Sequence, residues 1–86
     1  MDNWTPIGTQ YITVRWVPEE RTWVASCHGI AFNYPLAFCK GETTAARKAL
    51  RAYYTDQGHH VKITSMTVRK HYGKDVWDFA AEAMIR

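Results

Sequence analysis

Two cysteines and four histidines are the residues of this chain best suited to metal binding or nucleophilic catalysis. No pair among them has the Cys-x-x-Cys or His-x-x-x-His spacing of zinc sites. Cys27 and His28 are adjacent, and adjacent side chains of a strand point to opposite faces. The two are therefore badly placed to act as paired ligands, or as a nucleophile with its base. We expect neither a metal site nor a thiol-based catalytic centre.

Paired carboxylates could serve acid–base catalysis, and a Gly-rich loop could bind phosphate. Glu19 and Glu20 are adjacent, but they follow Pro18 in a polar stretch that is typical of an exposed turn. The glycines are scattered, so no Gly-rich loop is present that could hold a phosphate. We therefore expect a protein that is not an enzyme and that has no cofactor.

The basic residues are concentrated in the middle of the chain. Residues 40–74 hold eight Lys and Arg against Glu42 and Asp56, a net charge of +6, whereas the whole chain carries +3. A clustered positive charge attracts nucleic acid or an acidic protein surface. Phosphate contacts require little more than mobile cations on one surface. The candidate binding cations are Arg47, Lys48, Arg51, Lys62, Arg69 and Lys70.

Aromatic residues supply a second set of candidates, because exposed Trp and Tyr carry much of the energy of protein interfaces. Trp23 and Val24 lie on opposite faces of the strand they share, so one of these large side chains must face outward. Tyr54 lies near Arg51, and Trp77 lies off the apolar stripe of the segment that holds it. We expect Trp23, Tyr54 and Trp77 to contact a partner, although the alternative is that they cover the ends of a small core.

Length and composition indicate one compact domain over residues 1–86. The chain has 86 residues, 47% apolar and 14% aromatic, which is enough for one small core. No apolar run reaches the roughly 18 residues of a membrane span, and the start of the chain does not resemble a signal peptide. Two cysteines without a leader predict reduced thiols in a cytoplasm, although Cys27 and Cys39 could still pair.

Hydrophobic alternation predicts a hairpin after an extended lead over residues 1–10. Residues 11–17 and 22–28 alternate apolar and polar side chains around the polar turn at 18–21. A third, interrupted strand is expected at 30–32 and 36–39. The segment Asn33-Tyr34-Pro35 between its two parts is a turn signal.

Helical spacing follows from residue 42 onward. Thr43 or Thr44 is expected to cap a helix whose apolar stripe is Ala46, Ala49, Leu50 and Tyr53, with Gly58 ending it. Residues 61–70 predict a fourth strand, and its change of phase indicates a bulge near residues 64–65. The segment 75–86 is interpreted as a short terminal helix. The prediction is an α+β fold of order β-β-β-α-β-α, with the sheet and main helix in residues 11–74 and three to four antiparallel strands.

The predicted terminal helix would be apolar on more than one face, because Trp77 and Ile85 lie off the stripe of Val76 and Phe79. Two apolar faces require two contacts. We expect Trp77 to pack against Trp4 or Ile7 in the lead, or else to form the seam of a homodimer or a partner complex.

The hairpin at 11–27 followed by the segment 40–54, Lys-Gly-Glu-Thr-Thr-Ala-Ala-Arg-Lys-Ala-Leu-Arg-Ala-Tyr-Tyr, resembles the N-terminal half of HicB-type antitoxins. The same β-β-β-α unit is similar to part of the double-stranded-RNA-binding domain. In size and composition the chain also looks like the small inhibitors that phages encode. These resemblances imply a protein-binding module, of an inhibitor or antitoxin-like kind, in the cytoplasm of a bacterium or an infected host. A nucleic-acid binder that uses residues 40–74 is the alternative hypothesis.

Overall fold

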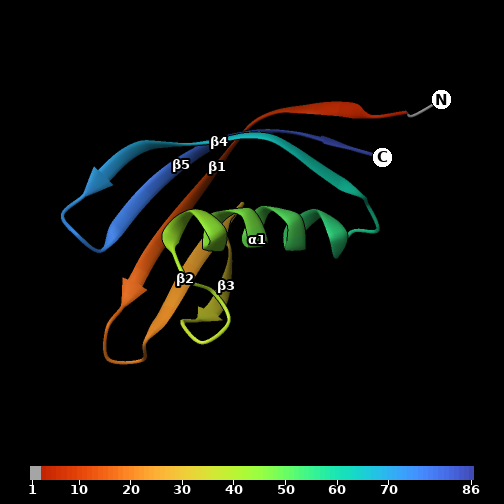
Figure 1. The fold of residues 1–86 in the computed structure, drawn as a ribbon. Coiled ribbons are helices and arrows are strands. Elements are labelled where there is room, and N and C mark those ends of the chain that lie inside the picture. Colours follow the sequence, from red (N-terminus) through yellow and green to blue (C-terminus); the bar gives the residue numbers. More distant parts are fainter. Residues whose placement is uncertain (1–2) are drawn as a thin grey trace.

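The computed structural model describes residues 3–86, which form a five-stranded antiparallel sheet with a helix against one face (Figure 1). The strands lie in the order β3-β2-β1-β5-β4, so the first and the last strand of the chain are neighbours in the middle of the sheet. The elements are β1 (Thr5–Val17), β2 (Thr22–Cys27), β3 (Ile30–Pro35), α1 (Glu42–Thr55), β4 (Val61–Tyr72) and β5 (Val76–Ile85). The α+β class and the antiparallel sheet are thus confirmed.

The predicted hairpin of β1 and β2 is present, and its alternation places the core. Ile12 and Val14 of β1 are fully buried, as are Ala25 and Cys27 of β2, which pair with them across the ladder. These side chains face α1, whereas the residues between them face the other side of the sheet. Residues 5–10 of the predicted extended lead belong to the sheet, because β1 begins at Thr5. Met1 and Asp2 lie outside the described residues.

Helix α1 forms because its small apolar residues recur at helical spacing and meet the sheet. Ala46, Ala49 and Leu50 are fully buried, as is Ala45, and Tyr53 is half-buried against the same core. Small side chains on both layers let the helix backbone approach the strands closely. The predicted cap is wrong: the helix begins after Gly41, and no side chain bonds its free N–H groups.

The predicted terminal helix is also wrong, because Val76–Ile85 forms strand β5 between β1 and β4. The segment also alternates: Phe79, Ala81 and Ala83 are buried toward α1, whereas Glu82 is exposed on the other face. Alanine and glutamate favour helices, but propensity is weak beside the burial and the two ladders that a central strand gains. The sheet therefore has five strands and not the predicted three to four, and the order of the elements is β-β-β-α-β-β.

Trp77 consequently has other neighbours than those expected. Its ring centroid lies 5.6 Å from that of Trp23, and the ring of His71 stacks on it at 5.1 Å. The predicted contact with Trp4 or Ile7 is not among its ring contacts. Trp77 is half-buried at the edge of the core, and its ring packs against side chains from strands of its own sheet.

Of the two edge strands, β3 differs from its prediction and β4 has the bulge that was predicted. Asn33-Tyr34-Pro35 was expected to turn, but these residues belong to β3, and the chain turns after Pro35. In β4 the predicted bulge is confirmed, since the register with β5 shifts between Ile63 and Ser65.

Among residues 3–86, no helix has the length and apolar character needed to cross a membrane.

Candidate functional site

Strand β3 is one edge of the sheet, and the turn before it fixes which of its backbone groups face outward. His28 and Gly29 form a two-residue turn with φ values of 52° and 80°, the left-handed pair that tight hairpins need. Glycine adopts this φ at no cost, but histidine does so only when other contacts hold it there. The closing pair across the turn is Cys27 with Ile30.

The pairing register leaves Ala31 and Asn33 as the residues whose backbone faces the free edge. Residues that flank a two-residue turn exchange backbone hydrogen bonds, and bonded and non-bonded pairs then alternate along the strands. The bonded residues of β3 are therefore Ile30, Phe32 and Tyr34. The N–H and C=O groups of Ala31 and Asn33 point away from β2. The edge ends at Pro35, whose carbonyl already accepts N–H bonds from Phe38 and Cys39 at 2.9 and 3.0 Å.

The other edge of the sheet, β4, carries features that hinder pairing with a further strand. Its register shifts twice, between Ile63 and Ser65 and again between Val68 and Lys70. It also carries three exposed cations, Lys62, Arg69 and Lys70. Bulges and edge lysines are devices by which proteins prevent unwanted strand addition. Strand β3 has neither, since it pairs with β2 in continuous register and contains no charged residue.

A groove of about 370 Å³ lies between β3 and α1. Tyr34 forms one wall, and Lys48, Arg51, Ala52, Thr55 and Asp56 of α1 form the other. The ring of Tyr34 stacks parallel to that of Phe32, with centroids 6.4 Å apart. Burial, with smaller contributions from Cys39 and Asp56, raises the pKa of Tyr34 above its usual range. The groove is thus aromatic on the strand side and charged on the helix side.

The two cations of the groove are each tied to a backbone carbonyl. Lys48 Nζ donates to the carbonyl of Phe38 at 3.2 Å and lies 5.9 Å from the centre of the Tyr34 ring. Arg51 Nη1 donates to the carbonyl of Val61 at 2.7 Å. A lysine has three donors and an arginine five, so most donors of both side chains are not used in these bonds.

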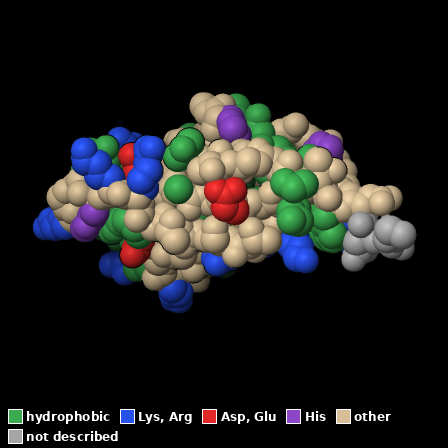
Figure 2. All heavy atoms as spheres, turned by 90° about the horizontal axis from the view of Figure 1, so that it is seen from above, with side chains coloured by type: hydrophobic (Ala, Val, Ile, Leu, Met, Phe, Trp, Pro, Cys, Tyr) green, Lys and Arg blue, Asp and Glu red, His purple; other side chains and the backbone are tan. Residues whose placement is uncertain are grey.

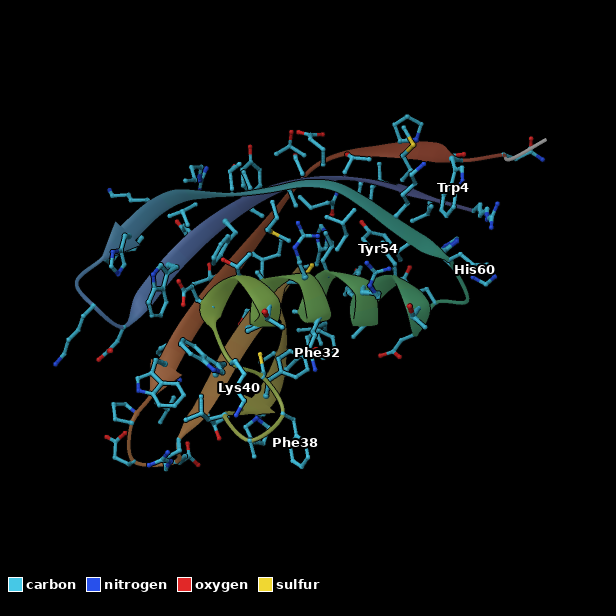
Figure 3. All side chains as sticks on the ribbon, in the orientation of Figure 1. Trp4, Phe32, Phe38, Lys40, Tyr54 and His60 are labelled. Carbon is cyan, nitrogen blue, oxygen red and sulfur yellow. The ribbon has the colours of Figure 1, made fainter. Side chains whose placement is uncertain are left out.

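An exposed phenylalanine lies in the loop that leads from β3 to α1. Phe38 is 78% exposed, the highest value among the large apolar side chains of residues 3–86. Figure 3 shows that it points away from the body of the molecule, whereas Phe32 lies between β3 and α1. A lone exposed Phe is ordinary, but the backbone carbonyl of this one accepts the bond from Lys48 of the groove.

A partly buried polar network centred on Gln10 holds the β2–β3 turn against the helix, and sequence reasoning missed it. Gln10 is only 5% exposed, and its Oε1 accepts bonds from Tyr54 Oη at 2.8 Å and from His28 Nε2 at 2.6 Å. Its Nε2 donates to the carbonyl of Ile7 at 2.9 Å. The His28 ring also packs on Tyr53, with centroids 4.7 Å apart. A glutamine in the middle of an alternating strand was the available signal.

The residues predicted to bind a partner do not form one surface. Arg47, Lys48 and Arg51 are exposed on α1, whereas the cations of β4 belong to the opposite edge strand. Trp23 is buried, and its Nε1 donates to the carbonyl of Cys39 at 3.0 Å, so it serves the core. Tyr54 is half-buried and projects from α1 toward the sheet (Figure 3), where burial raises its pKa.

Cys27 and Cys39 are both free and buried. Burial raises the pKa of the Cys27 thiol to about 11, which makes it a poor nucleophile. Within residues 3–86, no group of three or more His, Cys, Asp or Glu side chains could hold a metal ion.

A hollow of about 510 Å³ at the end of α1 is lined by cations and aromatic rings, among them Trp4, Arg51, His59 and His60. Figure 3 shows Trp4 and His60 at the same end of the molecule. The C-terminal end of a helix carries partial negative charge, which disfavours an anion there. We therefore assign no phosphate site to it.

Comparison with protein-family models, with curated proteins and with solved structures found no match to this chain.

Proposed function

We propose that this protein is a protein-binding module, of an inhibitor or antitoxin-like kind, that pairs strand β3 with an extended segment of its partner. The observation that carries the proposal is the difference between the two sheet edges. Strand β4 is bulged and charged, whereas β3 is regular and uncharged and has outward backbone groups at Ala31 and Asn33. Strand addition draws its affinity from main-chain hydrogen bonds and its specificity from alternate side chains.

The surroundings of β3 support this role. An added strand would direct every second side chain toward the groove between β3 and α1, because cross-strand neighbours share a face. The exposed ring of Phe38 would extend the contact beyond the edge. A bound segment held in this way is no longer available to its own ligands, which is how such a module would inhibit. The free, buried thiols of Cys27 and Cys39 support a reducing, cytoplasmic setting.

The test is a selection of peptides from a random ten-residue library displayed on their own mRNA. Wild type, Asn33→Pro and Asn33→Ala serve as baits. Proline at position 33 removes one outward N–H but no bond to β2, and edge strands tolerate proline. Alanine changes the same side chain and keeps the N–H, so it is the matched control.

We expect peptides that bind wild type and Asn33→Ala but bind Asn33→Pro at least about 10-fold more weakly, in line with a lost buried hydrogen bond and a steric block. Circular dichroism and thermal unfolding check that the proline variant is folded. N-methylation of alternate amides in a selected peptide should abolish binding in one of the two possible phases. Peptides that bind all three baits equally, or no enrichment at all, would refute strand addition at β3.

A second candidate function, nucleic-acid binding, is favoured by one observation. Lys and Arg side chains gather at the left end of the face shown in Figure 2, near the turn between β4 and β5. Arg69, Lys70 and Lys74 are exposed there, and Arg69 lies 4.5 Å from the centre of the Tyr11 ring. Asp78, which pairs with Arg69 at 3.4 Å, weakens this positive charge.

The second candidate requires that affinity for a 20-base-pair DNA or RNA duplex falls steeply with salt, with a log–log slope of about −0.7 to −0.9 per neutralised phosphate. Filter binding between 50 and 200 mM salt measures this slope. The double variant Lys70→Glu with Lys74→Glu should abolish the binding. A flat salt dependence, or an unchanged affinity of the double variant, would eliminate this function.

A further inference from the structure

We infer that the segment captured by β3 is acidic, with Asp or Glu at alternate positions whose side chains face α1. The inference rests on the proposed strand addition and goes beyond it by naming the chemistry of the partner. It follows from the position of the groove cations, the way they are held, and the sequence of β3 itself.

Positive charge prevails on the helix side of the groove. Lys48 and Arg51 line it, against the carboxylate of Asp56 at the end of the groove, and elsewhere on α1 the charges of Arg47 and Glu42 cancel. Asp56 also lies beyond the last residue of α1, whereas Lys48 and Arg51 lie within it. An incoming side chain that points toward Lys48 and Arg51 therefore meets positive charge, whereas one opposite Thr55 and Asp56 meets the negative end of the helix.

Lys48 is held at the groove before any partner arrives. Its bond to the Phe38 carbonyl keeps the ammonium beside the Tyr34 ring, whereas Arg51 lines the groove but donates to the carbonyl of Val61 at the start of β4, and both side chains keep further donors. Fixing a long side chain in advance lowers the entropy lost on binding. Charge-assisted bonds to carboxylates are the strong ones that such donors make.

The pattern of the partner follows from the geometry of a strand. Side chains opposite Phe32 and Tyr34 point toward α1, and those opposite Ala31 and Asn33 point to the other face. Only every second residue of the partner meets the cations. The other positions lie beside a small and a neutral polar side chain, which select no charge.

A second copy of this chain is a poorer occupant. Antiparallel pairing of β3 with β3 about a two-fold axis would place the two α1 helices on the same face of a continuous sheet. The identical surface patch would then meet itself, so Lys48 and Arg51 of one copy would approach those of the other. Like charges at such a seam oppose association, whereas an acidic strand neutralises them.

The experiment sequences the peptide pools selected by wild type and by two double variants. Lys48→Glu with Arg51→Glu reverses the groove charges, and Lys70→Glu with Lys74→Glu makes the same change in net charge at the β4–β5 end. We expect the wild-type pool and the Lys70/Lys74 pool to be enriched in Asp and Glu at alternate positions. The Lys48/Arg51 pool should lose that enrichment, and an acidic peptide from the wild-type pool should bind this variant at least about 10-fold more weakly at 0.15 M salt.

The outcomes separate the two ideas. If the peptides depend on the Asn33 N–H but carry no excess of Asp and Glu, strand addition stands and the inference about charge is wrong. If Lys48→Glu with Arg51→Glu leaves the pool unchanged, the inference is again wrong. If acidic peptides bind regardless of Asn33→Pro and of N-methylation, the cations attract them without strand pairing, and both proposals fail. Sedimentation of the wild-type chain as a dimer that Asn33→Pro dissociates would identify a second copy as the occupant and would also overturn the inference.

Discussion

The hydrogen bonds of the buried Gln10 side chain predict how firmly the β2–β3 turn is held. In Gln10→Met a side chain of similar size replaces the glutamine and removes its three hydrogen bonds, to Tyr54, His28 and the Ile7 carbonyl. Each such bond contributes about 1 kcal/mol net, so the variant loses about 3 kcal/mol. Burying an apolar side chain instead returns about 1.5 kcal/mol. We expect a net loss of about 1–2 kcal/mol in the free energy of unfolding.

Thermal and urea unfolding followed by tryptophan fluorescence measure this loss. For a domain of this size each kcal/mol lowers Tm by roughly 4–8 °C. The neighbouring substitution Thr9→Val is the control, because it removes only the exposed bond from Thr9 Oγ1 to Glu82 and should cost less than about 0.5 kcal/mol. Hydrogen exchange should quicken at the amides of β3 in Gln10→Met but not in Thr9→Val. A Gln10→Met protein as stable as wild type would show that the turn is held by ring packing and that our assignment of the network is wrong.

Three further predictions concern the groove and the core. Phe38→Ala should change the free energy of unfolding by less than about 0.5 kcal/mol, because the ring is 78% exposed. The same variant should lower the affinity for a selected peptide several-fold, as measured by fluorescence anisotropy. An unchanged affinity would show that Phe38 is not part of the interface. Trp23→Phe leaves the carbonyl of Cys39 without its indole donor and should cost about 1–3 kcal/mol in urea unfolding, whereas a neutral result would mean that the bond does not stabilise the loop. The pKa of Cys27 is raised from 9.0 to about 11, so its thiolate fraction at pH 8 falls about 100-fold. Iodoacetamide should therefore label Cys27 at least about 100-fold more slowly in the native chain than in the urea-unfolded chain. The fold favours the neutral thiol, so its contribution to the free energy of unfolding is complete below pH 9 and is lost as the pH rises toward 11. The Cys27→Ala protein should lack this loss of stability at alkaline pH. Labelling of Cys27 at equal rates in the native and unfolded chains would contradict the burial argument.

The hydrophobic periodicity of the sequence correctly predicted the β1–β2 hairpin, the bulge of β4 and the buried stripe of α1. The β1–β2 hairpin shows clear alternation, and the bulge near residues 64–65 was visible as a change of phase. The buried stripe of α1 was visible as helical spacing. In each case the side chains that face the core repeat with the period of the element itself, so a short window of sequence contains the information.

The last segment shows where such a window is not enough. Residues 76–85 satisfy both periods: Phe79, Ala80 and Ala83 make a helical stripe, and Phe79, Ala81 and Ala83 make one face of a strand. Alanine favours the helix when the segment is taken alone. What decides is the presence of β1 and β4 on either side, and nothing within the segment encodes these neighbours.

The candidate site was missed for the same reason. The cations of α1 could be recognised by type, but the free edge of β3 is a property of strand order. Asn33-Tyr34-Pro35 contains the residues of a turn, and only the tight turn at His28–Gly29 and the pairing with β2 draw them into a strand. That β3 lies at the edge follows from β1 pairing with β5 on its other side, a contact between the two ends of the described sequence.

The pairing of β1 with β5 also determines when the molecule can fold. Thr5 pairs with Ile85, so the central ladder joins residues that are far apart along the chain, and such contacts form slowly because a long loop must close first. During synthesis, β1, β2, β3 and α1 emerge while β1 still has an open edge and Ile12 lacks Phe79, its neighbour across the ladder. For that interval the nascent chain has two free edges, β3 and β1, and the edge of β1 is irregular between Pro6 and Thr9. The arrival of β5 closes the edge of β1, and the finished sheet has β3 and β4 as its two edges.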